Sequence, residues 1–401
     1  MANLRVMLII LVTLCFGAFC AGGCFHVAEP QAAPLESPEP EPQQAEPVAE
    51  DSTSVLVACV GDILMHGPLI SAGKRPDGSY DFTHFFAEVQ HYIEEADVAI
   101  ANLEGTISTS ERGYSGYPCF KAPEEIIWAL KEAGFNLVVT ANNHSFDGGE
   151  FGVIHTIDVL EKAGMHHTGT ARTAEERDQV LVLEKNDIRL AFLNYTYGTN
   201  GMEVNIPRDK IGYMVNYLHD TESIKLDIER AREREADVII AMVHWGPEYV
   251  RKPDEFQQRL AEDLFSLGVD IIFGSHPHVL QPMRFGHVVR DGGQAEVFVA
   301  YSLGNFISNQ RNEMIRYTDS GMILTLRITK QYGTGAMSIS DVRYTPTWVQ
   351  RYTQNGLFQY RVLPVGMFMP RGLPEQDSQR LEQVWEETTS LIGNERFRIV
   401  R

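Results

Sequence analysis

The chain has 401 residues, of which 44% are hydrophobic, so it holds enough apolar material for one large domain or two ordinary ones. Its formal net charge of −20 at pH 7 repels nucleic acid and anionic lipid headgroups at long range, which argues against nucleic acid as a partner. A polyanionic substrate would require a local cationic focus, and a bound metal could provide one.

The first 24 residues resemble a bacterial export signal. "MANLR" is short and positively charged, and residues 6–21 form an apolar run that is too short for a comfortable membrane span. The "AGGC" that follows resembles a lipoprotein cleavage site, which predicts that Cys24 carries lipid and anchors the protein at the extracellular face of the cell membrane. Because Ala21 stands in place of the usual leucine, an uncleaved N-terminal anchor and plain secretion remain alternatives.

Residues 25–51 are predicted to be an acidic, proline-rich, disordered linker. Residues 28–51 contain six prolines and no aromatic or basic residue, a composition that cannot build a packed core. Directly after an anchor, such a spacer would hold the folded part away from the membrane. Of the five cysteines, only Cys59 and Cys119 lie beyond the linker, which does not indicate a disulfide framework.

From residue 55 onward, short apolar segments alternate with helical ones. The predicted strands are residues 54–60, 97–103, 136–141, 188–195, 237–244 and 269–275. The predicted helices are residues 82–95, 124–133, 149–163, 221–235 and 254–267. Near-continuous apolar strands separated by helices predict a layered α/β domain whose sheet is covered on both faces.

The pattern changes after His287. Residues 295–306, 321–330 and 336–349 are β-rich and have no helical segment between them, which indicates a second and more antiparallel sheet. A polar helix over about residues 374–391 closes the chain. We therefore expect one domain over residues 52–345 and a C-terminal extension over residues 346–401 that contains this helix.

Residue types that bind metals follow the carboxyl ends of five predicted strands, the edge at which ligands bind in open α/β sheets. They are Asp62 and His66, Asn102 and Glu104, the group Asn142, Asn143, His144 and Asp147, then His244, and finally His276 and His278. Pro277 favours an extended backbone around it, so the last two histidines should point to the same side.

Each of these elements alone is compatible with an ordinary turn. Five of them at five strand ends indicate a shared metal site, because clustered carboxylates and histidines are costly unless they are paired or metal-bound. The donors are nitrogen and oxygen without thiolate, which suits Mn, Fe or Zn. Six candidate ligands exceed the need of a single ion, so we expect one or two divalent metal ions.

Several motifs, in this order, resemble the CapA family of poly-γ-glutamate capsule synthesis proteins. They are "GDILMHG", "ANLEGTIS", "FKAPEE", "TANNHSFDGG", "HWGPEY", "GSHPHVLQP" and "YSLGNFI". That family is similar in fold to the calcineurin-like metallophosphoesterases. The resemblance covers roughly residues 54–328 and implies a catalytic α/β domain, a sandwich of two mixed β-sheets flanked by helices, with a dinuclear site at the strand ends.

The resemblance also implies roles for single residues. It assigns Asp62 and His278 to the first metal, Asn143, His244 and His276 to the second, Glu104 to the bridging position, His144 to the general acid and Asp147 to the orientation of its ring. Leu64 stands where the phosphoesterases have the histidine of their Asp-x-His motif. His66 either replaces that ligand or only lines the cleft, and a mononuclear site at the second position remains an alternative.

The leading functional hypothesis is a membrane-anchored, metal-dependent protein of poly-γ-glutamate capsule synthesis or export. It would act on an amide or related bond through metal-activated water, as a hydrolase or transferase, with the polymer and membrane synthase or export proteins as partners. Lys121, Arg251 and Asn305 are candidates for substrate binding. The alternatives are a cell-surface metallophosphoesterase and a non-catalytic, metal-containing scaffold of the capsule synthase complex.

Overall fold

A computed structural model of the chain describes residues 52–290, 293–366 and 372–400. The predicted signal segment, Cys24 and the proline-rich linker lie outside the described residues. Within the described ranges, no helix combines the length and the apolar character needed to span a bilayer. Residues 50–401 form a single compact unit.

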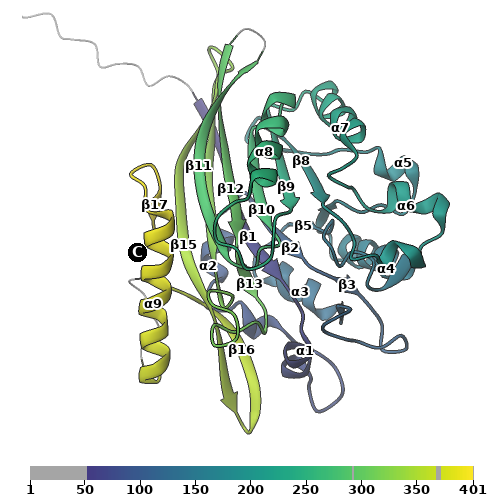
Figure 1. Cartoon of the computed structure of the whole chain (residues 1–401), viewed down its shortest axis with the longest axis vertical. Coiled ribbons are helices and arrows are strands. Elements are labelled where there is room, and N and C mark those ends of the chain that lie inside the picture. Colours follow the sequence, from purple (N-terminus) through teal and green to yellow (C-terminus); the bar gives the residue numbers. More distant parts are fainter. Residues whose placement is uncertain (1–51, 291–292, 367–371, 401) are drawn as a thin grey trace, which may run out of the picture. The chain divides into compact units, whose positions relative to one another are not determined.

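Two mixed β-sheets form the centre of the unit (Figure 1). The nine-stranded sheet has the order β16-β15-β14-β1-β2-β5-β6, with β13 paired to β1 and β17 to β15. Its strands are β1 (Ser52–Ile63), β2 (Val98–Leu103), β5 (Leu137–Val139), β6 (His166–Thr168), β13 (Asn305–Ile307), β14 (Ser320–Gln331), β15 (Met337–Gln354), β16 (Leu357–Pro364) and β17 (Arg398–Ile399). The parallel strands β1, β2 and β5 carry the first three metal-ligand motifs.

The six-stranded sheet has the order β11-β12-β10-β9-β8-β7. Its strands are β7 (Leu181–Lys185), β8 (Ile188–Thr196), β9 (Val238–His244), β10 (Ile271–Ser275), β11 (Leu280–Arg290) and β12 (Gly293–Leu303). β8, β9, β10 and β12 run parallel, and β7 and β11 are antiparallel edge strands. A separate two-stranded sheet joins β3 (Thr106–Ile107) to β4 (Lys121–Ala122).

The sheets pack on each other through one large hydrophobic core. On β1, Val55, Val57 and Cys59 face this core, together with side chains of β8, β9, β10 and β12. The alternate residues Ala58 and Val60 face the opposite side, where they pack against helices. A strand alternates its side chains between two faces, so burial of both faces explains the near-continuous apolar run.

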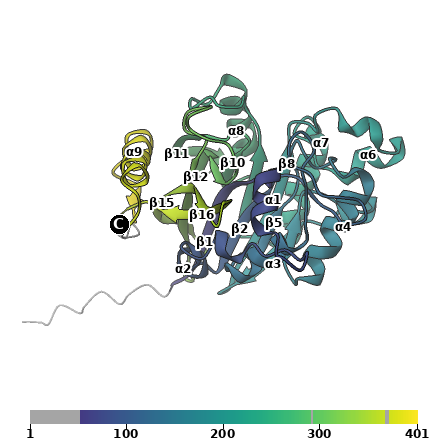
Figure 2. The ribbon, with the colours of Figure 1, turned by 90° about the horizontal axis from the view of Figure 1, so that it is seen from below.

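Helices cover both outer faces (Figures 1 and 2). The nine-stranded sheet packs against α1 (Gly67–Gly73), η1 (Thr83–Phe85), α2 (Gln90–Glu94), α3 (Glu125–Glu132) and α4 (Gly149–Lys162). The six-stranded sheet packs against α7 (Thr221–Glu233) and α8 (Glu255–Leu267). The shorter elements are α5 (Ala174–Arg177), η2 (Met202–Asn205) and α6 (Arg208–Met214). The predicted sandwich of two mixed sheets flanked by helices is confirmed.

The strands after His287 do not form a sheet of their own, so that prediction is wrong. β12 pairs with β10 in the six-stranded sheet, whereas β14 pairs antiparallel with β1 in the nine-stranded one. Strands β12 and β14 belong to different sheets, and both contribute apolar side chains to the core between the sheets. The predicted helix over residues 82–95 is also interrupted, since only η1 and α2 are helical there.

The C-terminal residues belong to the same layers. β15 runs through the expected boundary between residues 345 and 346, and β16 and β17 both pair with it. The closing helix α9 (Glu375–Ile392) packs against β15 and β11 (Figure 2). Leu381 and Val384 of this helix meet Trp348 and Leu363 in a small core. The extension therefore completes the nine-stranded sheet and its cover.

Candidate metal centre

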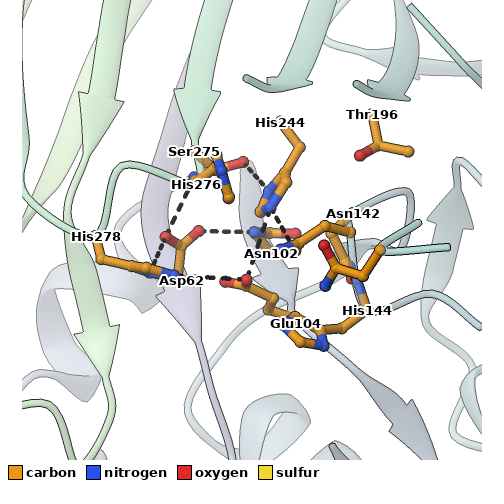
Figure 3. Close-up of polar contacts among 12 residues, drawn as sticks. Asp62, Asn102, Glu104, Asn142, His144, Thr196, His244, Ser275, His276 and His278 are labelled. Atoms are coloured by element: carbon orange, nitrogen blue, oxygen red, sulfur yellow. Dashed lines mark hydrogen bonds and ion pairs between the residues drawn. The ribbon is translucent and has the colours of Figure 1, made fainter. Parts of the chain in front are cut away.

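The carboxyl ends of the parallel strands bring the predicted ligands into one space (Figure 3). Asp62 of β1 lies opposite Asn102 of β2, and Ser275 of β10 lies opposite His244 of β9. Parallel strands end at the same edge of a sheet, so residues that are far apart in the chain meet there. Gly61 permits the close crossing of β1 and β13, since a Cβ atom at residue 61 would lie 1.9 Å from the carbonyl oxygen of Gly304.

Asp62 is fully buried and holds three groups. Its Oδ1 accepts a hydrogen bond from Asn102 Nδ2 at 2.8 Å, and its Oδ2 accepts one from the backbone N–H of His276 at 3.3 Å. Oδ2 also lies 3.0 Å from His278 Nδ1. Burial by itself would lower the pKa of His278, but Glu104 and Asp62 raise it to about 9.

Glu104 lies at the middle of the centre with no hydrogen-bond donor. Its side chain is buried, and neither carboxylate oxygen has a hydrogen-bond partner among the described residues. Oε1 lies 3.6 Å from His244 Nε2 and 3.7 Å from His278 Nε2. Burial raises the pKa of Glu104 well above its ordinary value. A buried carboxylate costs several kcal/mol without compensation, so these orphaned oxygens fit a cation.

Two histidines on the other side of Glu104 have the protonation state of metal ligands. Burial, reinforced by neighbouring histidines, lowers the pKa of His276 to about 3 and that of His244 well below its ordinary value. Ser275 Oγ lies 2.9 Å from His244 Nδ1, and Asn143 Oδ1 lies 3.0 Å from His244 Nε2. His276 Nδ1 is buried without a partner among the described residues. Both rings are neutral at pH 7, the form in which imidazole binds metals.

Three groups of donor atoms lie close enough to share an ion. In each group, the donors are within 4.8 Å of one another. The groups are Asp62, Glu104 and His278; Glu104, His244 and His276; and Glu248, His276 and His278. The first two match the sets that the resemblance assigned to the two metals, and they have Glu104 in common. The predicted ligands are therefore brought together, with Asn143 joined to the second set through His244.

Glu248 is the residue of this centre that the sequence reasoning missed. It is exposed, and it belongs to the "HWGPEY" motif, four residues after His244. Its loop is held in place by two hydrogen bonds: Gln281 Nε2 donates to the Val250 carbonyl at 2.8 Å, and Tyr249 N–H donates to the Pro277 carbonyl at 2.8 Å. A carboxylate just past a strand end was a detectable signal, but only the tertiary structure places it beside the histidine pair.

The backbone of that pair is not extended, so the prediction from Pro277 is wrong. His276 has φ +94° and His278 has φ +56°, values that non-glycine residues rarely adopt. The chain turns here between β10 and β11, and the local bonds to Asp62 and Tyr249 hold the turn. Such strain persists where surrounding contacts determine it, and it is frequent at functional sites. The two imidazole centroids still lie only 5.9 Å apart.

Comparison with known proteins identifies the family. The family described as "Bacterial capsule synthesis protein PGA_cap" matches residues 56–310. The chain belongs to this family. It is 28% identical over 279 residues to "Capsule biosynthesis protein CapA" of Bacillus anthracis, which covers 67% of this chain and 64% of that protein.

It is also 27% identical over 296 residues to "PGA biosynthesis protein CapA" of Bacillus subtilis (strain 168), covering 73% and 72% of the two chains. The alignment thus spans just under two thirds of the Bacillus anthracis protein. Among solved structures, a phosphatase from Mycoplasma pneumoniae, described as novel, aligns with a TM-score of 0.40 and 15% identity, covering 73% of this chain and 93% of that one.

In this PGA_cap chain, His144 is oriented by Asp147. His144 Nδ1 lies 2.7 Å from Asp147 Oδ2, and the backbone N–H of Phe120 donates to the same oxygen at 2.5 Å. The Phe120 ring meets the imidazole edge-on at 4.7 Å. These contacts fix the ring with Nδ1 toward the carboxylate, which directs Nε2 away from it.

His66 lies beside the centre of the PGA_cap chain but belongs to none of the three donor groups. Its Nδ1 accepts the backbone N–H of Asn309 at 3.2 Å and lies 3.1 Å from the Leu64 carbonyl. Its ring meets Phe120 edge-on at 5.0 Å. Burial lowers its pKa to about 4. Of the two alternatives for His66, this placement favours lining the cleft.

The three candidates for substrate binding lie in different surroundings. Asn305 is fully buried. Its Nδ2 donates to the Thr318 carbonyl at 2.7 Å, and its Oδ1 lies 3.1 Å from His278 Nδ1. Asn305 therefore positions His278 and has no free group for a substrate. Arg251 points to α9, where it donates to the Glu387 carbonyl at 2.8 Å. Lys121 is half-buried in β4. The predicted role of Asn305 is corrected accordingly.

Two tyrosines border the centre on its accessible side. The ring of Tyr197 lies 4.7 Å from that of His276 and nearly parallel to that of His244 at 6.4 Å, and its side chain is 40% exposed. Tyr249 lies 6.1 Å from His278. Both tyrosine side chains are partly exposed, whereas the three histidines next to them are buried.

Proposed function

We propose that the protein is a metal-dependent enzyme of poly-γ-glutamate capsule synthesis or export that acts on an amide or a related bond. The observation that carries the proposal is Glu104, a buried carboxylate that two sets of histidine and carboxylate donors share and that has no hydrogen-bond donor within the described part of the chain. The printed names of the two Bacillus relatives, which concern capsule and PGA biosynthesis, support the polymer.

One or two divalent ions, Mn, Fe or Zn, fit the donor set of carboxylate and imidazole. Asp62, Glu104 and His278 would hold one ion, and Glu104, His244, His276 and the Asn143 amide would hold the other. The exposed Glu248 lies close to His276 and His278 and would supply a metal ligand in place of the motif histidine that Leu64 replaces. When bound, such an ion polarises a carbonyl or phosphoryl oxygen and lowers the pKa of water.

The protein's own proton donor in this proposal is His144. Asp147 accepts the hydrogen bond of Nδ1–H, so the opposite nitrogen, Nε2, is the atom that transfers a proton to the departing amine or alkoxide. The backbone N–H of Phe120 keeps Asp147 in place. Tyr197 and Tyr249 border the route by which the substrate reaches these groups.

The proposal includes the location and the partners. The sequence "AGGC" supports an anchor at Cys24 on the extracellular face of the cell membrane, and the acidic linker supports a folded part that stands off from it. An enzyme held there meets a polymer that is made or exported by membrane synthase and export proteins. An uncleaved N-terminal anchor gives the same topology.

A cell-surface metallophosphoesterase is the second candidate. It is favoured by the His144–Asp147 pair beside two metal-type donor groups, which serves an alkoxide leaving group as well as an amine. The bond that is broken separates the two candidates.

The test uses the full chain purified in detergent and loaded in turn with Mn, Fe or Zn. We expect metal-dependent shortening of poly-γ-glutamate chains, together with metal in the purified protein. His144→Ala should keep the metal and lose the activity, whereas His276→Ala should lose both. Cleavage of a generic phosphodiester with an intact polymer would move the function to the second candidate. A metal-containing protein that leaves both substrates intact would contradict both enzymatic functions.

A further inference from the structure

A cavity of about 400 Å³ lies next to the metal centre. Its walls are the loop 308–313 after β13, parts of β15 and β16, and the first half of α9. It has no part in the chemistry proposed above. Its side chains are mostly polar, and they include the arginines Arg311 and Arg351.

These two arginines differ from most half-buried arginines of the described ranges because neither has an ion-pair partner there. Both are half-buried. Every other half-buried arginine of the described ranges, except Arg251, has a carboxylate oxygen at 4.0 Å or less. Among the described residues, Arg311 donates to the sulfur of Met314 at 3.1 Å, and Arg351 makes a side-chain hydrogen bond with Tyr360 and lies 4.6 Å from the Phe358 ring centroid. Two guanidinium groups therefore remain available to an anion.

None of the three acidic side chains around the cavity forms an ion pair with Arg311 or Arg351. Asp319 accepts two hydrogen bonds from Arg380, at 2.8 and 2.9 Å, and one from Trp348 at 2.9 Å. Asp377 accepts a hydrogen bond from Gln350. Glu313 is exposed to solvent. The three arginines and three carboxylates of the cavity balance in charge, but Arg311 and Arg351 have no carboxylate partner among the described residues and can accept one from a ligand.

The cavity is joined to the metal centre through one loop. The hydroxyl of Tyr360, near which both arginines lie, donates to Asn309 Oδ1 at 2.7 Å, and the backbone N–H of Asn309 donates to His66. The next residue, Gln310, accepts a hydrogen bond from Asn305 at 2.9 Å, and Asn305 contacts His278. The loop is thus the wall between the two spaces.

We propose that Arg311 and Arg351 form a subsite for carboxylate groups of an acidic polymer whose reacting bond lies at the metal centre. This subsite rests on the proposed function, because it names the part of the polymer next to that bond. Guanidinium groups suit it, since their planar forks bind carboxylates through paired hydrogen bonds. A polymer with one carboxylate per unit presents such groups on both sides of any bond that is broken.

The experiment measures binding of a short γ-linked oligomer of glutamate to the full chain in detergent, loaded with Mn²⁺. All variants carry His144→Ala so that the oligomer stays intact. The double variant Arg311→Gln with Arg351→Gln is compared with the control Arg259→Gln. Arg259 is exposed, and among the described residues its guanidinium donates only to the Glu255 carbonyl of its own helix. A γ-linked oligomer of glutamine, with the same length and no charge, tests whether the carboxylates matter.

We expect the double glutamine variant to bind the glutamate oligomer about tenfold more weakly, as loss of charge-assisted hydrogen bonds implies. Arg259→Gln should bind as the parent does, and binding of the glutamine oligomer should not depend on Arg311 or Arg351. The affinity of the double variant Arg311→Lys with Arg351→Lys should lie between those of the parent and the glutamine variant, because lysine keeps the charge and loses the paired hydrogen bonds of the guanidinium group. If the glutamine pair does not fold, the lysine pair carries the test.

Equal affinities in the double variant and the Arg259→Gln control would overturn the subsite, as would an equal loss for the uncharged oligomer. A stronger dependence on the two arginines for polyphosphate than for the glutamate oligomer would overturn the carboxylate class. Metal titration of the same proteins reports on the proposed function separately. If the titration shows that no metal binds while oligomer binding still depends on the two arginines, the metal centre is refuted and the subsite is supported.

Discussion

Replacing Glu104 by glutamine changes the charge at the middle of the metal centre and leaves the size of the side chain nearly unchanged. In the metal-free protein, the substitution removes a buried carboxylate that lacks hydrogen-bond donors. Burial outweighs the attraction of His278 in raising the pKa of this group, so the charged form is unfavourable there. We therefore expect the metal-free variant to be at least as stable as the metal-free wild type.

With metal, the order should reverse. A ligand present at 100 times its Kd stabilises the folded state by about 2.7 kcal/mol. If loss of the carboxylate weakens metal binding by about 100-fold, the upper end for residues that support metal sites, the same concentration stabilises the variant by only about 0.4 kcal/mol. At roughly 2.1 cal/mol/K of unfolding entropy per residue, the difference shifts the unfolding midpoint of a domain of this size by about 3 °C.

The assay is thermal unfolding of wild type and Glu104→Gln, with a chelator and with Mn²⁺, alongside metal analysis of both. Glu132→Gln is the control, because Glu132 is exposed on α3 and has no ion-pair partner among the described residues. The reasoning is refuted if Mn²⁺ raises the midpoint of Glu104→Gln as much as that of the wild type. A metal-free variant well below the metal-free wild type would show that Glu104 supports the fold by itself.

Other consequences of the same geometry can be measured directly. Glu248→Gln should weaken metal binding by about tenfold and leave the metal-free midpoint unchanged, because the side chain is exposed; an unchanged titration would remove Glu248 from the centre. His144→Ala should lower turnover by about 10²–10⁴-fold at unchanged metal content, and full turnover would mean that the proton comes from another group. His278, whose pKa is about 9, must lose its proton before it binds a cation, so metal affinity should rise by about tenfold per pH unit from pH 7 to 9 and then level off. A flat profile over that range would contradict this assignment.

Much of the candidate site could be predicted from where the ligand-type residues stand relative to the predicted strands. Asp62 and Glu104 could be predicted to converge because they lie at the carboxyl ends of two neighbouring parallel strands of one sheet. His244 lies at the carboxyl end of a strand in the other sheet, and the packing of the two sheets on each other brings it to the same place. The same apolar runs predicted burial of both faces of each sheet, which three hydrophobic cores confirm. These properties depend on local patterns of two to ten residues, so the sequence alone contains them.

Other features depend on contacts between distant segments. The turn at Pro277, with positive φ at His276 and His278, is set by bonds to Asp62 and Tyr249 and not by the preference of proline for extended neighbours. Pairing of β14 with β1 decides which sheet the C-terminal strands join. Local propensity is worth a fraction of a kcal/mol per residue, and tertiary packing easily exceeds it.

The sequence by itself determined the layered α/β class, the strand ends at which metal-type donors occur, and the family to which the chain is similar. Only the tertiary structure decided that Glu248 joins the centre, that Asn305 positions His278, and that Arg311 and Arg351 meet in one cavity. The reason is physical: a strand's period reports which way a side chain points, whereas its neighbours across a loop or a second sheet depend on how the whole chain closes on its core.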